Sequence, residues 1–221
     1  MVLTRSQAAA YYNRFGSKQD TQSFYEDAAV VDLFAHANLE SAESVFELGC
    51  GTGRFASSLL SSHLRASASY LGMDISRIMV ELARERISAY GDRAKVILTD
   101  GSMHFPAVDG SIARVVSTYV FDLLSESDMH QAVSESRRVL SPGGKLCLIS
   151  LTCGTTFISK LVSGIWSQVF RLRASLVGGC RPIQLEAVLG QRGWSIDYRN
   201  VIVQWGVPSE VLIASPVDDI I

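Results

Sequence analysis

The chain has 221 residues, of which 48% are hydrophobic, and its 20 basic residues nearly balance 22 acidic ones. This length suits one substantial core, and the near-neutral charge excludes a general attraction to nucleic acid or to an anionic membrane. No uninterrupted apolar stretch approaches 18 residues, so we expect no transmembrane helix. The N-terminal residues lack the apolar core of a secretory signal. We expect a cytoplasmic protein that acts on a small molecule.

Predicted strands and helices alternate along the chain, as in parallel βαβ units. We therefore predict one α/β domain over residues 1–221, with a doubly wound, Rossmann-like sheet. Its seven strands are mostly parallel, helices cover both faces, and a C-terminal strand is antiparallel. The predicted helices are Ala8–Phe15, Thr21–Leu39, Arg54–His63, Ser76–Tyr90, Glu126–Leu140, Thr156–Arg173 and Gln184–Gln191. The predicted strands are Val45–Leu48, Ser69–Met73, Lys95–Leu98, Ala113–Thr118, Lys145–Leu151, Trp194–Gln204 and Glu210–Ala214.

The most informative segment is Val45–Ala56, in which an apolar strand leads into three alternate glycines and then a helix. Gly49, Gly51 and Gly53 permit positive φ angles and a close approach of the backbone to a ligand. The following helix presents its free N–H groups to the same place. Cys50 lies within this loop. The arrangement predicts a nucleotide-type site.

Three acids, Glu47, Asp74 and Asp100, stand at or near predicted strand ends. Asp74 is placed to accept hydrogen bonds from ribose hydroxyls. Asp100 is placed to accept a hydrogen bond from an exocyclic amine. Glu47 would repel a pyrophosphate but could hold a cation, so the set fits S-adenosylmethionine (SAM). Gly51–Ala56 also satisfies a dinucleotide fingerprint, which leaves an NAD(P)-dependent oxidoreductase as an alternative. Asp74 could instead be a solvated helix-entry residue, and Asp100 a turn residue before Gly101.

Five motifs, in order, carry a resemblance to a known family. They are ELGCGTG (Glu47–Gly53), LGMDIS (Leu71–Ser76), TDGS (Thr99–Ser102), VDGSIARVVSTYVFDLL (Val108–Leu124) and RRVLSPGGKL (Arg137–Leu146). Over residues 44–152 the chain resembles the class I SAM-dependent methyltransferases, in the type 11 group related to quinone and small-molecule methyltransferases.

The resemblance implies that SAM is the cofactor and that its methyl group passes to a small acceptor by in-line displacement. A hydrophobic or lipid-like acceptor is one interpretation. A SAM-binding protein without catalysis is a further alternative. The implied cofactor-binding residues are Glu47 at the ammonium, Gly49, Cys50, Gly51 and Gly53 under the methionine portion, Asp74 at the ribose, Ile75, Asp100, Gly101 and Ser102 around the adenine, and Thr118 at the boundary with the acceptor.

Methyl transfer from a sulfonium needs mainly proximity and orientation, with a general base only where the acceptor loses a proton. The candidates near the methyl position are Tyr119, Asp122 and Tyr12. Many relatives carry histidines at about residues 121–123, and this chain does not. Asp122 is a substitute base or, alternatively, a helix cap or structural hydrogen-bonding group. The four cysteines show no zinc-type spacing, so we predict no metal site.

Two segments outside these motifs are expected to shape the acceptor site. Residues 1–40 are predicted to form a helical lid, and residues 153–192 a helical acceptor-site insertion. The helix over 157–170 carries a broad apolar stripe flanked by Lys160 and Arg171. Packing on the sheet and pocket is the usual role of such a stripe. A dimer contact or a peripheral contact with a lipid-like acceptor or membrane surface is the alternative, and we expect a monomer or homodimer.

Overall fold

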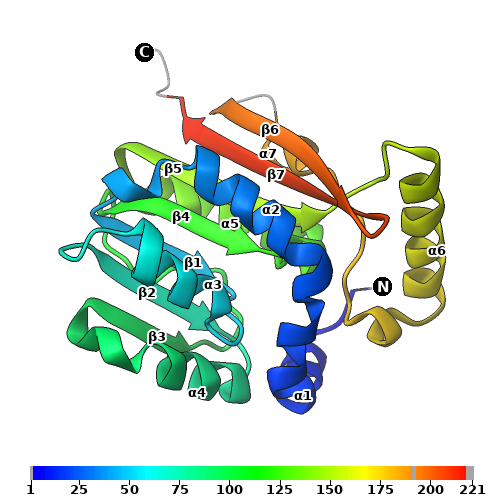
Figure 1. Ribbon diagram of the computed structural model, residues 1–221, viewed down its shortest axis with the longest axis horizontal. Helices are drawn as coiled ribbons and strands as arrows, with labels where there is room; N and C mark the ends of the chain where they lie inside the picture. Colours follow the sequence, from blue (N-terminus) through cyan, green and yellow to red (C-terminus); the bar gives the residue numbers. More distant parts are fainter. Residues whose placement is uncertain (1, 191–192, 218–221) are drawn as a thin grey trace.

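Seven strands form a sheet in the order β3-β2-β1-β4-β5-β7-β6 (Figure 1). The computed structural model describes residues 2–190 and 193–217, so the parts of predicted ranges at residues 1, 191–192 and 218–221 lie outside it. Neighbouring strands are parallel except β7, which is antiparallel to β5 and β6. This confirms the predicted fold class. The strands are β1 Ser44–Leu48, β2 Ser69–Asp74, β3 Ala94–Leu98, β4 Ile112–Thr118, β5 Leu140–Leu151, β6 Trp194–Gln204 and β7 Val207–Pro216.

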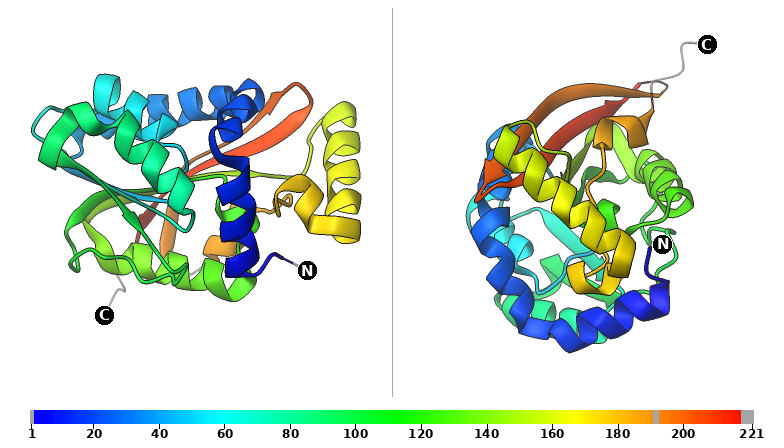
Figure 2. Two further views of the ribbon diagram at one scale, coloured as in Figure 1. Left: turned by 90° about the horizontal axis from the view of Figure 1, so that it is seen from below. Right: turned by 90° about the vertical axis from the view of Figure 1, so that its right-hand side faces the viewer.

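Helices cover both faces of the sheet (Figures 1 and 2). They are α1 Arg5–Phe15, α2 Ser23–His36, α3 Arg54–Ser58, α4 Arg77–Arg86, α5 Glu126–Val139, α6 Phe157–Arg173 and α7 Leu185–Leu189. Shorter helical segments are η1 Gly16–Gln22, η2 Leu39–Ser41, η3 Leu59–His63, η4 Ser88–Arg93, η5 Phe121–Leu123 and η6 Ala174–Val177.

Alternate strand residues build two apolar cores, because successive side chains of a strand point to opposite faces. Val45 and Val116 belong to a buried cluster that includes side chains of α2, α3 and α4. Their neighbours Phe46 and Val115 belong to a second cluster, with side chains of α5 and α7. Burial on both faces explains why apolar residues stand at consecutive positions of these strands rather than at alternate ones.

Most predicted boundaries hold to within a few residues, and the exceptions have local causes. Ser76 caps α4 as predicted, because its hydroxyl accepts a hydrogen bond from the N–H of Met79. The helix predicted over Arg54–His63 becomes a π-helix from Leu59 onward. Leu140 was predicted to end a helix but begins β5, where it pairs with Ile112 of β4.

The expected packing of the α6 stripe is wrong for much of its length. The buried residues of α6 are two serines, Ser159 and Ser163, whereas Phe157, Leu161 and Ile165 are exposed. Among the residues described, no helix combines the length and apolar character needed to cross a membrane.

Candidate functional site

The three glycines between β1 and α3 have positive φ, as the sequence predicted, and they serve different purposes. Gly49 and Gly53 lie where a side chain would collide. A Cβ at Gly49 would lie 2.3 Å from Cγ2 of Val120, and one at Gly53 would lie 2.9 Å from Cα of Ala83. A Cβ at Gly51 would meet nothing within 4 Å. The first and third glycines therefore allow close packing, and Gly51 leaves open space over the loop.

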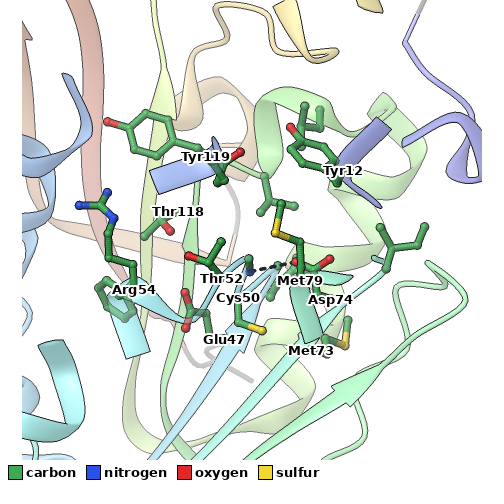
Figure 3. Close-up of a pocket in the computed structure, with 18 of the residues that line it drawn as sticks. Tyr12, Glu47, Cys50, Thr52, Arg54, Met73, Asp74, Met79, Thr118 and Tyr119 are labelled. Carbon is green, nitrogen blue, oxygen red and sulfur yellow. Dashed lines mark hydrogen bonds between the residues drawn. The ribbon is translucent and has the colours of Figure 1, made fainter. Parts of the chain in front are cut away.

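Glu47 is a buried carboxylate at the floor of this site (Figure 3). Its Oε2 accepts a hydrogen bond from the Tyr70 hydroxyl at 2.5 Å. Burial, aided by the nearby Asp74 charge, raises the pKa of Glu47 to about 8, although the Tyr70 bond opposes the rise. Within the described ranges, no basic side chain forms an ion pair with Glu47. A cationic ligand group would supply the missing counter-charge.

Asp74 ends β2 and points into the same space. One carboxylate oxygen accepts the N–H of Gly51 at 2.9 Å (dashed in Figure 3), and the other accepts the N–H of Ser76 at 2.8 Å. Burial raises the pKa of Asp74, and these N–H groups partly offset that rise. The residue is thus fixed at the strand end with its carboxylate at the pocket wall, as a hydroxyl-binding acid requires.

The residues predicted to surround an adenine separate into two groups. Ile75 and Gly101 line the main pocket, whereas Asp100 and Ser102 do not. The Asp100 carboxylate is exposed and accepts the N–H of Ser102 at 2.8 Å. Asp100 instead lines a shallow neighbouring hollow with Arg5 of α1. Its contact with the adenine amine stays a prediction.

Thr118 ends β4 and Tyr119 follows it, and both line the pocket together with Tyr12 of α1 (Figure 3). Tyr119 has a φ of 56°, and its hydroxyl donates to Oγ of Ser209 at 2.8 Å. The Tyr12 hydroxyl lies 4.0 Å from Sγ of Cys180. Burial raises the pKa of both phenols, so neither is ionised at neutral pH. They can orient a ligand by hydrogen bonds.

Asp122 is fully buried and is not among the pocket-lining residues. One of its oxygens accepts the N–H of Leu151 at 3.2 Å. The other has no hydrogen-bond partner among the residues that the structure describes. Burial raises the Asp122 pKa to about 7. The placement favours the structural alternative for Asp122 over a role as base.

Sequence reasoning missed Glu26 of α2, a nearly buried carboxylate that lines the pocket. Nη2 of Arg54 donates to its Oε2 at 2.8 Å, and Arg54 also pairs with Asp27. Burial raises the pKa of Glu26 to about 7 despite this cation. The sequence did contain an indication of this acidic partner. Arg54 stands in the first turn of α3, where the helix dipole disfavours a cation. An arginine there indicates an acidic partner.

Polar links tie the N-terminal segment across the pocket. Asn13 of α1 accepts hydrogen bonds from the Ser76 hydroxyl at 2.8 Å. Asp20 of η1 accepts a hydrogen bond from the Thr52 hydroxyl in the glycine loop at 2.5 Å. Its carboxylate also forms an ion pair with Arg86 at 2.6 Å. The cavity has a volume of about 570 Å³, and residues of this segment line it. That the segment acts as a lid stays a prediction.

Comparison with known proteins agrees with this geometry. The family model described as a methyltransferase domain matches residues 45–144, which span the glycine loop and the three strand-end acids. This part of the chain is therefore similar to the methyltransferase domains. The unpaired Glu47, the fixed Asp74 and the open side of Gly51 suit S-adenosylmethionine, a ligand with an ammonium and a ribose.

Among curated relatives, methyltransferase GfsG of Streptomyces halstedii is 31% identical over 54% of this chain and 41% of its own. Demethylmenaquinone methyltransferase of Lactiplantibacillus plantarum is 30% identical over 65% of the chain and 59% of its own. The chain thus spans about half the length of these relatives. The solved [4+2]-cyclase SpnF superposes with a TM-score of 0.71 at 15% identity, over 98% of both chains, and shows the shared fold.

Proposed function

We infer that the chain is a cytoplasmic enzyme that transfers the methyl group of SAM to a small, apolar acceptor of lipid-like character. The observation that carries this proposal is the pocket wall beyond the glycine loop. That wall is formed by Leu3, Tyr12, Tyr119 and Leu123, which offer apolar surface with two phenol hydroxyls. The four cysteines are unpaired thiols, as in a reducing compartment.

The cofactor roles follow from the strand-end acids. SAM, when bound, would supply an electrophilic methyl carbon that an acceptor atom attacks in line, and the thioether sulfur would leave as S-adenosylhomocysteine. Glu47 would hold its ammonium and Asp74 its ribose hydroxyls. The burial of both carboxylates strengthens these interactions, since the local dielectric is low. The remaining assigned residues are Gly49, Cys50, Gly51 and Gly53 in the loop, Ile75, Asp100, Gly101 and Ser102 near the adenine, and Thr118 at the acceptor boundary.

The acceptor would be positioned by protonated phenols and deprotonated by a carboxylate. Tyr12 and Tyr119 keep their protons, so they would donate or accept hydrogen bonds at the acceptor. Glu26 is the better base candidate than Asp122, because it lines the pocket and has a pKa near 7. Arg54 holds the Glu26 carboxylate in place at 2.8 Å.

Two measurements test the proposal. Calorimetric titration should show binding of SAM and S-adenosylhomocysteine but not of NADH, because Glu47 opposes a pyrophosphate. Incubation with methyl-labelled SAM should then transfer label to quinone, phenol or lipid acceptors. NADH binding without a response to SAM would refute the cofactor assignment. SAM binding without transfer to any acceptor class would favour the non-catalytic alternative.

A further inference from the structure

Helix α6 departs from the usual amphipathic arrangement of a surface helix, because Val162 and Trp166 pack inward while other large apolar side chains face outward. Its buried residues are Ser159 and Ser163, whose hydroxyls bond to backbone carbonyls of the same helix. The opposite side carries a row of exposed apolar side chains. The exposed fractions are 85% for Phe157, 57% for both Leu161 and Ile165, and 85% for Leu172. The helix stands at one end of the molecule in Figure 1 and in the left panel of Figure 2, and it faces the viewer in the right panel of Figure 2.

The tip of the β6–β7 hairpin extends this apolar surface. A Cβ at Gly206 would lie 3.2 Å from Cγ2 of Val162 in α6, so the tip and the helix are in contact. Trp205, the preceding residue, is 78% exposed and has a φ of 53°. Such turns favour asparagine or glycine, and a large aromatic side chain there is uncommon. Two elements thus present apolar side chains together.

The charged side chains of α6 and its flanking segments have one sign. From residue 152 to residue 185 the sequence contains no aspartate or glutamate. Lys160 and Arg171 lie along one flank of the apolar row, and Arg173 lies along the other; all three are exposed. Flanking cations with aliphatic stems suit a helix that lies in a membrane interface, because their charged ends reach phosphate groups.

We propose that the α6 surface, defined as the exposed side chains of α6 with Trp205, binds the surface of an anionic lipid bilayer. A second copy of the chain fits less well, because a two-fold contact would bring like cations together without an acid to pair them. Each cation near an anionic membrane strengthens binding about fivefold. The apolar row would enter the boundary between headgroups and acyl chains.

The inner side of α6 connects this surface to the pocket. Nε1 of Trp166 donates to the carbonyl of Cys180 at 3.1 Å, and Cys180 contacts the pocket-lining Tyr12. Binding of α6 to a bilayer would therefore bring one wall of the pocket close to the lipid. The lipid contact itself does not depend on the proposed methyl transfer, because it is defined by exposed side chains alone.

The test is co-flotation of the full chain with vesicles. We expect binding to vesicles of equal parts phosphatidylglycerol and phosphatidylcholine at least tenfold stronger than to phosphatidylcholine alone, with weakening at 0.5 M salt. The double variant Leu161→Asp, Ile165→Asp should lose binding. The matched variant Val108→Asp should keep it, since Val108 is 76% exposed but lies in another region.

A second pair of variants separates charge from apolar contact. Lys160→Glu should weaken binding to the phosphatidylglycerol vesicles by about tenfold or more, whereas Lys95→Glu on β3 should not. Circular dichroism spectra should match the wild type, because every substituted side chain is exposed. Absence of binding to anionic vesicles would overturn the proposal. So would binding that survives the double variant, or a dimer in analytical ultracentrifugation that the double variant abolishes.

Discussion

Glu47→Gln offers the sharpest test of how the pocket recognises its cofactor. The amide oxygen can still accept the Tyr70 hydroxyl, so the substitution removes a charge and keeps the hydrogen bond seen at 2.5 Å. In the wild type, burial holds the Glu47 pKa at about 8. Binding of an ammonium beside it requires the carboxylate form, so binding must expel a proton at any pH below 8.

The magnitude follows from that pKa. At pH 7 about ten protonated Glu47 carboxyls exist for each ionised one, and at pH 6 about a hundred. Ionising Glu47 before binding therefore costs about 1.4 kcal/mol at pH 7 and about 2.7 kcal/mol at pH 6. We expect the affinity of the wild type for SAM to rise about tenfold from pH 6 to pH 7. The Glu47→Gln variant should show no such rise.

The assay is isothermal titration calorimetry with SAM in two buffers that differ in ionisation enthalpy. The difference in observed heat counts the protons released, and we expect about one per SAM at pH 6.5 for the wild type and none for Glu47→Gln. Asp100→Asn is the control, because this exposed carboxylate should not alter the pH slope. Parallel pH profiles for wild type and Glu47→Gln would refute the placement of the ammonium at Glu47.

Three further predictions concern the loop and the other buried acids. Gly53→Ala should lower the free energy of unfolding by about 3 kcal/mol, because alanine is strained at positive φ and its Cβ would lie 2.9 Å from Cα of Ala83. Gly51→Ala meets the strain without the contact, so its loss in melting curves should be smaller, ~1 kcal/mol. Glu26→Gln should slow transfer to acceptors that lose a proton and remove the limb near pH 7 from the pH–rate profile; an unchanged limb would exclude Glu26 as base. Asp122→Asn should leave the transfer rate within about twofold, because Asp122 does not line the pocket. Burial raises the Asp122 pKa from 3.8 to about 7, so the carboxyl's contribution to stability is present below pH 3.8 and is lost as the pH rises through 7. Asp122→Asn should therefore raise the melting temperature at pH 8 relative to the wild type, and an equal shift at pH 5 would contradict this explanation.

The sheet could be predicted from the sequence because its signals are local. Strands such as β4 are rich in apolar residues, and residues such as Ser76 mark helix starts through their own hydrogen bonds. The glycine loop could also be predicted from the sequence, since the turn requires positive φ angles and Gly49, Gly51 and Gly53 have them. These elements depend on near neighbours in the chain.

The missed features depend on contacts between distant residues. Glu26 is one of several acids near the N-terminus, and only the fold brings it to Arg54. An Asp-Gly pair such as Asp100-Gly101 occurs both in ligand-binding loops and in ordinary turns. The motif alone therefore could not predict that the Asp100 side chain is exposed. The α6 stripe has a helical period whether it faces the core or the outside. Periodicity identifies an apolar face without saying what covers it.

The links between the N-terminal segment and the rest of the molecule also bear on the order of folding. Arg5 pairs with Asp128, 123 positions away, and the Tyr12 hydroxyl bonds to Gly178, 166 positions away. Contacts between residues so far apart in the chain have a high entropic cost of loop closure, so we expect them to form late in folding. Few apolar side chains of α1 are buried, so this segment can detach while the sheet stays intact. We therefore expect this segment to assemble late and to open before the core, which would let ligands exchange without unfolding of the core.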